Sequence, residues 1–393
     1  MSWRMFSLLF VGAVCCACQE ETFDLQKEHT SPTGLVGNPD YLPSPMLTAG
    51  NRLYLVGHQD GSFPELGWHI AGEMGGIWNH PIKLMDGFTA TISHAEKTDT
   101  LNAAVSFTNY PFANVHEFAF PELDLQAERW QFVPDDTEGM VVQYQLRNKG
   151  TETRQFDFSF LGYADLRPTW LADRLQIKDG QDTGVFDASL GAWVVTDQQN
   201  PWTVVYGGPA TTDGATELAN EYAGKGFAGQ ATYRLTLAPR EQQMLQFVIA
   251  GSYRSGAAAR GTYRDLRQRA GELFAAKQLR YAQLAARTKL TVPDKDLERT
   301  FTWLKYNCDW LVRTVPEIGT GIGAGLPDYP WWFGVDSEYA LQGYMMIGQD
   351  QTVRQTIALL DSLSEVTNGN GRIVHEVSTN GVVFNPGNLN ETP

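Results

Sequence analysis

Cysteine is scarce in this chain of 393 residues. Only four are present, and three of them, Cys15, Cys16 and Cys18, stand close together near the N-terminus. If those three belong to an N-terminal processing segment, Cys308 is left without a partner. A disulfide framework is therefore excluded as the main source of stability, and the fold has to depend on a hydrophobic core.

Basic residues are few relative to acidic ones. The chain has 30 Lys and Arg against 45 Asp and Glu, which gives a formal net charge of −15. Such a charge repels polyanions unless a basic patch exists, and the one dense group of Lys and Arg lies within residues 260–287. Its spacing is typical of the solvated face of a helix. We therefore expect no nucleic-acid partner, whereas a neutral substrate is unaffected by the charge.

The N-terminus lacks an apolar run long enough to span a bilayer. The run over residues 6–14 follows Arg4 and has the length of a signal-peptide core. The three cysteines come directly after it, which resembles a bacterial lipoprotein signal, where a cysteine becomes the lipidated first residue of the mature chain. We expect lipidation at Cys18. Cys16 is the alternative, because Cys15 and Cys16 stand where Leu and Ala or Ser are usual.

This signal, residues 1–18, predicts export and a lipid anchor as the only contact with the membrane. The expected location is the bacterial outer membrane, on its periplasmic side or at the cell surface. Residues 19–21 include an acidic pair that resembles the surface-export tag of Bacteroidetes lipoproteins. The polar residues 19–45, punctuated by Pro and Gly, predict a flexible tether.

Residues 46–253 repeat one pattern, a short alternating run followed by a turn. Residues 140–146 and 156–161 alternate in this way on either side of a turn at residues 148–151, which predicts a hairpin. β-Branched and aromatic residues are enriched in the further runs of this kind, over residues 52–56, 89–93, 103–107, 192–195, 202–206, 231–237 and 243–249. The segment therefore predicts a large antiparallel β-sandwich.

Residues 58–88 depart from the strand-and-turn pattern. They hold His58, His69 and His80, together with acidic residues. The histidines are about eleven residues apart, so no two of them share a helix or strand at a metal-binding spacing, and we expect neither a metal nor a cofactor. The segment predicts a long loop on the sandwich, and a contribution to the rim of a substrate site is the functional alternative.

After residue 253 the apolar period changes from two to three or four. Residues 254–293 predict linker helices with one break, and Asp294 or Asp296 is expected to cap the first helix of a further domain, residues 294–393. That helix has two apolar stripes, one with Leu297, Phe301, Leu304, Cys308 and Leu311 and the other with Trp303, Tyr306 and Trp310. We expect it to pack inside a larger helical assembly, with Cys308 as a buried structural thiol. Another helix is predicted over residues 353–366.

Residues 321–349 carry the densest chemistry of the chain. A loop of Gly and Pro leads to Trp331, Trp332 and Phe333, and Asp336 then opens a predicted helix. Aromatic faces suit the axial C–H groups of a sugar, and a carboxylic acid beside them could protonate a glycosidic oxygen. Asp is also a preferred helix N-cap, so a structural Asp336 with the rings in a core explains the same pattern.

Residues 371–393 show little periodicity and many polar side chains, among them His375, Glu376, Asn388 and Glu391. This composition predicts a loop that lines a polar site, although a loop made only of turn residues would look similar.

These segments together resemble the six-hairpin glycosidases, in particular the bacterial amylo-alpha-1,6-glucosidase or glycogen-debranching group. The resemblance covers most of residues 51–393 and is most specific in AGLPDYPWWFGVDSEYALQG and GRIVHEVSTNGVVFNPGNLNETP. It implies a multidomain β + α fold, with an N-terminal supersandwich, a linker helix and an (α/α)6 barrel. It also implies inverting hydrolysis with Asp336 as the general acid, although Val335 stands where many members have Arg. Substrate contacts are then expected from Trp331, Trp332, Phe333, His375, Glu376, Asn388 and Glu391.

The expected barrel is incomplete in this sequence. Twelve helices need several hundred residues, whereas residues 294–393 suffice for about three. We therefore expect a C-terminally truncated glycosidase that lacks its general base. The expected function is an exported glycoside hydrolase acting on alpha-glucan or related oligosaccharide linkages. The alternatives are a non-catalytic, surface-anchored glycan-binding lipoprotein and a phosphorolytic or lyase relative.

Overall fold

The computed structural model describes residues 23–29 and 34–384, and it is dominated by two large antiparallel sheets. The first sheet has nine strands in the order β1-β7-β8-β9-β10-β17-β14-β13-β12. Its strands are β1 (Leu35–Val36), β7 (Ser106–Tyr110), β8 (Ala113–Phe120), β9 (Leu125–Phe132), β10 (Gly139–Asn148), β12 (Asp182–Asp187), β13 (Ala192–Asp197), β14 (Thr203–Gly207) and β17 (Gln242–Ser252).

The second sheet has eight strands, seven of them in the order β15-β16-β11-β5-β4-β3-β2, with β6 paired to β5. They are β2 (Pro45–Ala49), β3 (Leu53–His58), β4 (Gly76–Asn79), β5 (Ile82–His94), β6 (Lys97–Thr100), β11 (Arg154–Pro168), β15 (Gly214–Leu218) and β16 (Phe227–Leu237). Short 3-10 helices lie at η1 (Pro39–Tyr41), η2 (Pro121–Leu123) and η3 (Ala172–Leu175).

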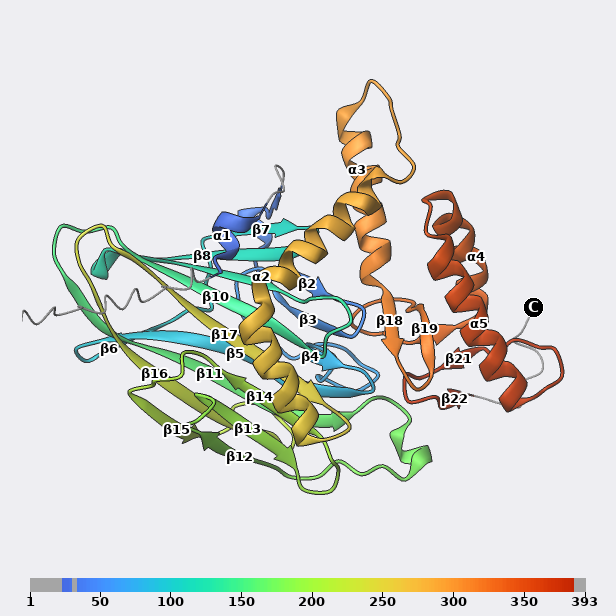
Figure 1. The fold of residues 1–393 in the computed structure, drawn as a ribbon, viewed down its shortest axis with the longest axis horizontal. Helices are drawn as coiled ribbons and strands as arrows, with labels where there is room; N and C mark the ends of the chain where they lie inside the picture. Colours follow the sequence, from blue (N-terminus) through green and yellow to red (C-terminus); the bar gives the residue numbers. More distant parts are fainter. Residues whose placement is uncertain (1–22, 30–33, 385–393) are drawn as a thin grey trace, which may run out of the picture.

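The two sheets face each other across the larger of the hydrophobic cores (Figure 1). Val142 and Phe247 are directly opposed on β10 and β17 and point into this core. Their neighbours Val141 and Val248 point to the other side of the sheet, where helix residues cover them. The period of two in the sequence thus sorts side chains between two apolar layers, and the predicted antiparallel β-sandwich is confirmed.

The hairpin predicted from residues 140–161 is wrong. β10 pairs with β9 and β17 in one sheet, whereas β11 pairs with β5 and β16 in the other, so the turn crosses between the layers. Asn148 holds this crossing, since its side-chain amide donates to the carbonyl oxygens of Glu152 (2.7 Å) and Leu237 (3.0 Å). Alternation predicted both strands, but two strands facing one core look the same whether or not they pair with each other.

The segment predicted as a tether differs from the structure over its described part. Helix α1 (Leu25–Glu28) packs on the sandwich, where the amide of Leu25 donates to Oε1 of Gln143 at 2.8 Å and its side chain is fully buried. The ring of Phe23 lies 5.7 Å from that of Phe274, and β1 adds a short edge strand to β7. The apolar residues Phe23 and Leu25 are sufficient to dock this otherwise polar segment on the sandwich and α2. The predicted signal and Cys18 lie outside the described residues.

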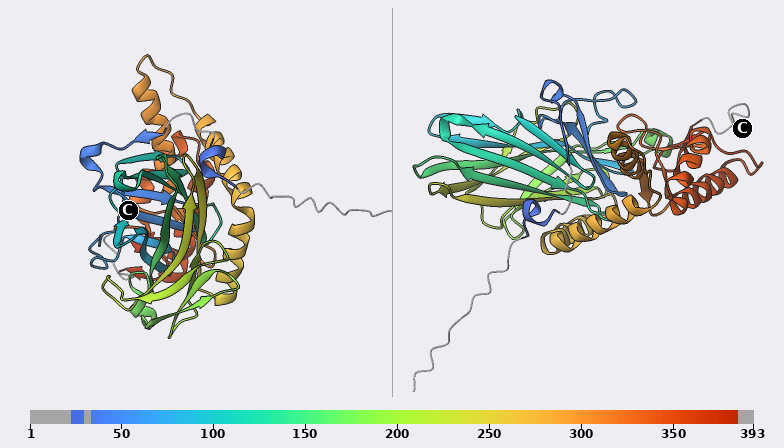
Figure 2. Two further views of the ribbon diagram at one scale, coloured as in Figure 1. Left: turned by 90° about the vertical axis from the view of Figure 1, so that its left-hand side faces the viewer. Right: turned by 90° about the horizontal axis from the view of Figure 1, so that it is seen from above.

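Helix α2 (Gly256–Ala286) follows the sandwich and runs across the outer face of the nine-stranded sheet, as two views agree (Figures 1 and 2). Ser255 caps it by accepting the amide of Ala258 at 3.2 Å, and Arg269 leaves the helical conformation at the one irregularity in its course. Tyr263 and Leu266 cover the sheet. Within the described residues, no helix is both long and apolar enough to cross a membrane.

Helix α3 (Lys295–Trp310) begins at the predicted cap, where Asp294 accepts the amides of Asp296 and Leu297. Its stripe of Trp303, Tyr306 and Trp310 is buried against the sandwich and α2. Of the other predicted stripe, Leu297 and Leu304 are about half exposed. The prediction that both stripes are covered is therefore wrong for these two residues, which no described element packs over.

The described residues after α3 form a smaller unit at one end of the sandwich (Figure 1). It contains the hairpin β18 (Val312–Val315) and β19 (Gly319–Ile322), the helices α4 (Gly334–Met346) and α5 (Asp350–Thr367), and a three-stranded sheet of β20 (Trp332–Phe333), β21 (Glu376–Val377) and β22 (Val383–Phe384). The molecule is thus a multidomain β + α protein, with three helices after α2 in its described part.

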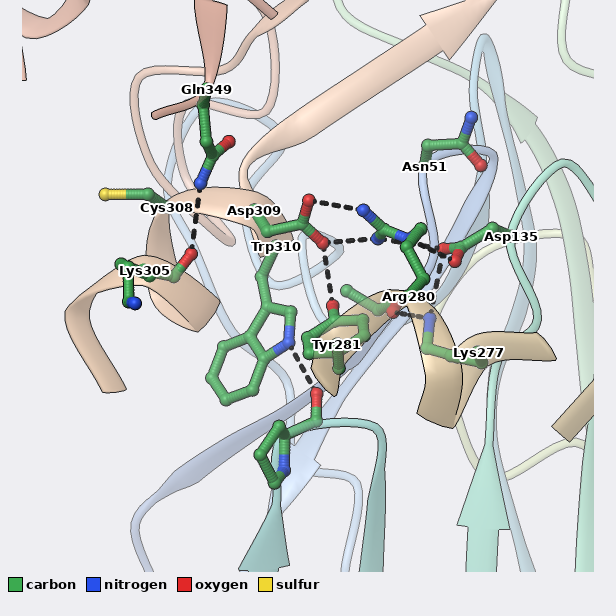
Figure 3. Close-up of polar contacts among 12 residues, drawn as sticks. Asn51, Asp135, Lys277, Arg280, Tyr281, Lys305, Cys308, Asp309, Trp310 and Gln349 are labelled. Atoms are coloured by element: carbon green, nitrogen blue, oxygen red, sulfur yellow. Dashed lines mark hydrogen bonds and ion pairs between the residues drawn. The ribbon is translucent and has the colours of Figure 1, made fainter. Parts of the chain in front are cut away.

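Charged side chains hold α3 to α2 and to the sandwich (Figure 3). Arg280 of α2 lies between two carboxylates, with Nε 2.7 Å from Oδ2 of Asp135 on the sandwich and Nη2 2.5 Å from Oδ2 of Asp309 on α3. The hydroxyl of Tyr281 donates to the same Asp309 oxygen at 2.8 Å, and Lys277 also reaches Asp135. Burial disfavours the charge of Asp135, but Lys277 and Arg280 outweigh this effect and lower its pKa.

Candidate active site

Asp336 is the third residue of α4. The helix N-cap is Phe333, which makes no side-chain capping bond, so the prediction that Asp336 opens the helix as its N-cap is wrong by three residues. Asp336 lies in the first turn of the helix. Its side chain is exposed.

A cavity of about 560 Å³ opens beside this carboxylate. Its walls are mostly apolar and come from the end of α3, the strand β19, the loop after it and α4. They are Leu311, Ile322, Gly323, Ala324, Phe333, Val335, Asp336, Ser337, Tyr339, Ala340 and Tyr344. Among these described lining residues Asp336 is the only carboxylate. An acid in a largely apolar hollow of this size can bind a small organic group and transfer a proton to it.

The three predicted aromatic residues divide into two groups. Trp331 and Trp332 are completely buried, whereas Phe333 lines the cavity. Trp331 stacks on Trp170 of the sandwich, with ring centroids 5.0 Å apart, and Trp332 packs among Leu359 and other core residues of α5. The prediction of an open platform is therefore wrong for the two Trp rings, because a fully buried ring offers no face to a sugar. Burying such large apolar side chains stabilises the loop instead.

The segment of His375 and Glu376 lies beside the acid loop. Phe333 pairs with Glu376 across β20 and β21, and the amide of Gly334 donates to the carbonyl oxygen of His375 at 2.9 Å. A Cβ at Gly334 would lie 2.4 Å from the carbonyl oxygen of Val374, so this approach requires glycine.

The two side chains of this segment differ in their surroundings. The ring of His375 meets Phe333 edge-on, with centroids 5.9 Å apart. Glu376 is buried and accepts a hydrogen bond from Nε1 of Trp331 at 2.5 Å. The structure thus brings Asp336, His375 and Glu376 into one region, with Glu376 turned toward the Trp331 side. Asn388 and Glu391 lie outside the described residues.

The histidines of the long sandwich loop do not converge on one point. His80 is buried, with Nδ1 2.6 Å from Oγ1 of Thr379 and Nε2 3.1 Å from the hydroxyl of Tyr54. Burial and the nearby Arg313 lower its pKa to about 3, so His80 is neutral and ties the sandwich to the segment after β21. His69 lies instead among the rings near Trp331, with centroids 5.0 Å apart. No pattern in the sequence indicated Thr379 or Trp170.

An acidic cluster on the sandwich has the geometry of a cation site. Glu73, Asp86 and Asp165 are buried, and one oxygen of each lies within 4.8 Å of the others. The Nζ atom of Lys83 lies 2.8 Å from Glu73 and 2.5 Å from Asp86, so the protein supplies its own cation there. Burial raises the pKa of Asp86 to about 6 and that of Asp165 to about 7.

Two solved structures share this fold over most of the chain. A bacterial glucoamylase complexed with acarbose aligns with a TM-score of 0.58 and 8% identity, covering 86% of this chain and 52% of the other. A putative kojibiose phosphorylase from the human microbiome aligns with a TM-score of 0.54 and 11% identity, covering 88% of this chain and 51% of the other. No family model and no curated protein matches the sequence.

These likenesses show a shared fold. The chain spans about half the length of either structure. A shared fold does not fix the sugar, the linkage or the role of any residue, because these depend on the side chains of the site.

Proposed function

We propose that this chain carries the proton-donating part of an exported glycoside hydrolase that acts on an alpha-glucan or a related oligosaccharide. The observation that carries the proposal is the position of Asp336, a lone exposed carboxylate in the first turn of α4 beside a cavity of about 560 Å³. Phe333 and Tyr339 add aromatic surface to the same cavity, which suits the C–H face of a sugar. The shared fold with a glucoamylase gives further support.

In this mechanism Asp336 donates its proton to the glycosidic oxygen while the bond from that oxygen to the anomeric carbon breaks. The proton leaves with the departing sugar, and water supplies the new hydroxyl group at the anomeric carbon. Inverting hydrolysis needs a second carboxylate, roughly 6.5–9.5 Å from the first, to take a proton from that water. Asp336 is the only carboxylate among the described residues that line the cavity. We propose that the second one comes from outside the described residues.

Phosphorolysis is the second candidate, and one observation favours it. Phosphate is already an anion, so it can attack the anomeric carbon without a general base, and a site with one carboxylate is then sufficient. The fold shared with a putative kojibiose phosphorylase points in the same direction. Turnover that requires inorganic phosphate and releases a sugar phosphate would establish this reaction in place of hydrolysis.

The finer assignments belong to the same proposal. They are amylo-alpha-1,6-glucosidase-like specificity, lipidation at Cys18, and a place at the outer membrane with the lipid as the only membrane contact. Labelling of the protein with a fatty acid in its host, and loss of the label in a Cys18→Ala variant, would test the anchor. A label that persists in that variant but disappears in Cys16→Ala would move the anchor to Cys16.

Substitution of Asp336 by Asn in the full-length protein tests the catalytic proposal. We expect the release of sugar from alpha-glucan oligosaccharides to fall roughly 100- to 10,000-fold, because the amide cannot donate the proton. Asp350→Asn is the matched control, since Asp350 also lies in the first turn of a neighbouring helix but does not line the cavity. We expect near-normal activity from it.

Two results would contradict the proposal. One is undiminished hydrolysis by the Asp336→Asn protein. The other is saturable glycan binding by the unmodified protein with no release of sugar, with or without phosphate, which is the behaviour of the non-catalytic alternative.

A further inference from the structure

Two aromatic side chains are exposed where the sandwich meets the acid loop. Trp68, on the loop between β3 and β4, is 62% exposed, and Tyr329, on the loop before β20, is 37% exposed. Trp68 is the one exposed tryptophan among the residues that the structure describes. The two rings are close to perpendicular, with an interplanar angle of 72° and centroids 5.9 Å apart. They form an open corner of aromatic surface, which the buried Trp331 and Trp332 do not.

The loop that presents Trp68 has a fixed shape. Gly67 adopts a φ of +88°, and a Cβ there would lie 2.3 Å from Met74, so only glycine fits. The amide of Gly72 donates to the carbonyl oxygen of Gly67 at 3.0 Å, which closes the turn. The amide of Trp68 donates to Oδ1 of Asp328 at 3.1 Å, which anchors the tip of the loop to the acid loop.

His69 supports the exposed ring from one side. Its ring stacks on that of Trp68, with centroids 3.8 Å apart and an interplanar angle of 26°. His69 also meets Tyr329 edge-on, with centroids 4.7 Å apart. Trp68 is therefore held before any ligand arrives, and binding to it costs little ordering of the loop.

The aromatic corner lies next to the cavity of Asp336. The ring of Tyr329 lies 6.0 Å from that of Phe333, which lines the cavity. Gly325 and Tyr329 exchange two backbone hydrogen bonds of 2.9 Å, and Ala324, the residue before Gly325, is another lining residue. An oligosaccharide could therefore place one sugar ring in the cavity and the next on the aromatic corner.

Polar groups surround the rings and select the kind of ligand. The carboxylate of Asp328 lies at the base of the corner, where it accepts the amide of Trp68. Burial lowers the pKa of His69, and Asp328 opposes this effect. A carboxylate beside aromatic faces accepts hydrogen bonds from hydroxyl groups and repels anions. This combination fits a neutral pyranose better than a phosphorylated or acidic sugar.

We propose that Trp68 and Tyr329 form a pyranose-stacking subsite that binds a further sugar unit of the oligosaccharide outside the acid cavity. The inference rests on the proposed function and adds to it, since it predicts a preference for neutral oligosaccharides over single sugars. It also gives the β-sandwich a direct part in substrate binding, through the loop of Trp68.

The test measures binding by the full chain with Asp336→Asn, so that the ligand is not consumed. Maltohexaose is the probe. Isothermal titration calorimetry measures its affinity for every variant, and acrylamide quenching of tryptophan fluorescence reports whether the sugar covers Trp68. We expect maltohexaose to protect a tryptophan from acrylamide in this protein. Trp68→Ala, introduced into the Asp336→Asn protein, should remove the protection and weaken binding about five- to tenfold, which is the effect expected from the loss of one aromatic contact. Trp68→Phe should restore most of the affinity.

Tyr41→Ala is the matched control, because Tyr41 is a comparably exposed ring, at 64%, on the 3-10 helix η1. We expect unchanged binding from it. If the Trp68→Ala protein fails to fold by circular dichroism, Tyr329→Ala provides the same test from the other ring.

The outcomes separate this inference from the proposed function. If Trp68→Ala and Tyr329→Ala bind maltohexaose as well as the parent does, while the unmodified protein hydrolyses it, the subsite is refuted and the proposed function stands. If Trp68→Ala changes the oligomeric state and not the affinity for the sugar, the corner is a protein contact and the inference is likewise refuted. Absence of both binding and hydrolysis in the unmodified protein refutes both.

Discussion

Replacing Arg280 by alanine tests how firmly α3 is held on α2 and the sandwich. Asp309 is only 9% exposed at its side chain, and Arg280 is its cationic partner. Removing one member of a buried ion pair costs about 3–5 kcal/mol, because the other charge stays buried. Arg280 itself is partly exposed, and Asp309 keeps the hydrogen bond from Tyr281, so we expect about half of that cost, about 2 kcal/mol.

Urea unfolding followed by tryptophan fluorescence measures this loss, since Trp303 and Trp310 lie at the junction. Limited proteolysis between α2 and α3 is the second readout, and it should become faster. The control is Arg299→Ala on α3, whose partner Asp296 is exposed, and we expect a change below about 0.5 kcal/mol from it. Adding Asp309→Asn to the Arg280→Ala protein should recover part of the stability, because the uncompensated charge is then gone.

Equal urea midpoints for Arg280→Ala and Arg299→Ala would refute this reasoning. So would a large loss in Arg280→Ala that Asp309→Asn does not reduce. Either result would mean that the apolar stripe of α3, and not the charged contacts of Arg280, accounts for the attachment of α3.

Two further predictions concern buried carboxylates. Burial raises the pKa of Asp182 to about 8, so the folded protein holds a proton there that the unfolded chain releases near pH 4, and stability should fall as the pH rises through 8. Urea unfolding of an Asp182→Asn protein should lose about 3 kcal/mol less between pH 6 and 9 than the parent, and parallel curves would contradict this. Trp331→Phe keeps a ring but leaves Glu376 without the hydrogen bond from Nε1, and it should cost about 1–3 kcal/mol in the same assay. A Trp331→Phe midpoint equal to the parent's would show that this bond adds nothing to stability.

The sequence predicted where strands and helices lie better than it predicted which strands pair with each other. Alternation over residues 140–146 and 156–161 identified two strands, and Asp294 identified a helix start, because each signal is local. Which sheet a strand joins depends on its pairing partners. β9 directly precedes β10, but the other partners, β17, β5 and β16, lie far from β10 and β11 in the chain. A period of two carries no information on that choice.

The candidate site was predictable in its position but not in its surroundings. Asp336 and the segment of Glu376 do lie in one region, joined by the pairing of β20 with β21. Trp331 and Trp332 are buried, and the exposed ring is Trp68, which stands in a loop without periodicity. The sequence around an aromatic residue can look the same whether its ring is buried in a core or exposed on a binding surface. Only the packing of the other elements decides whether the ring is covered.

The docking of residues 23–29 has a consequence for the distance between the protein and its proposed anchor. Phe23 is fixed against Phe274 of α2, only five residues after Cys18. Five extended residues reach about 17 Å, roughly two to three times the depth of one lipid headgroup layer. A lipid on Cys18 would therefore keep the face of the sandwich that carries α1 and α2 within about this distance of the bilayer surface, and it would restrict how the molecule can turn above it.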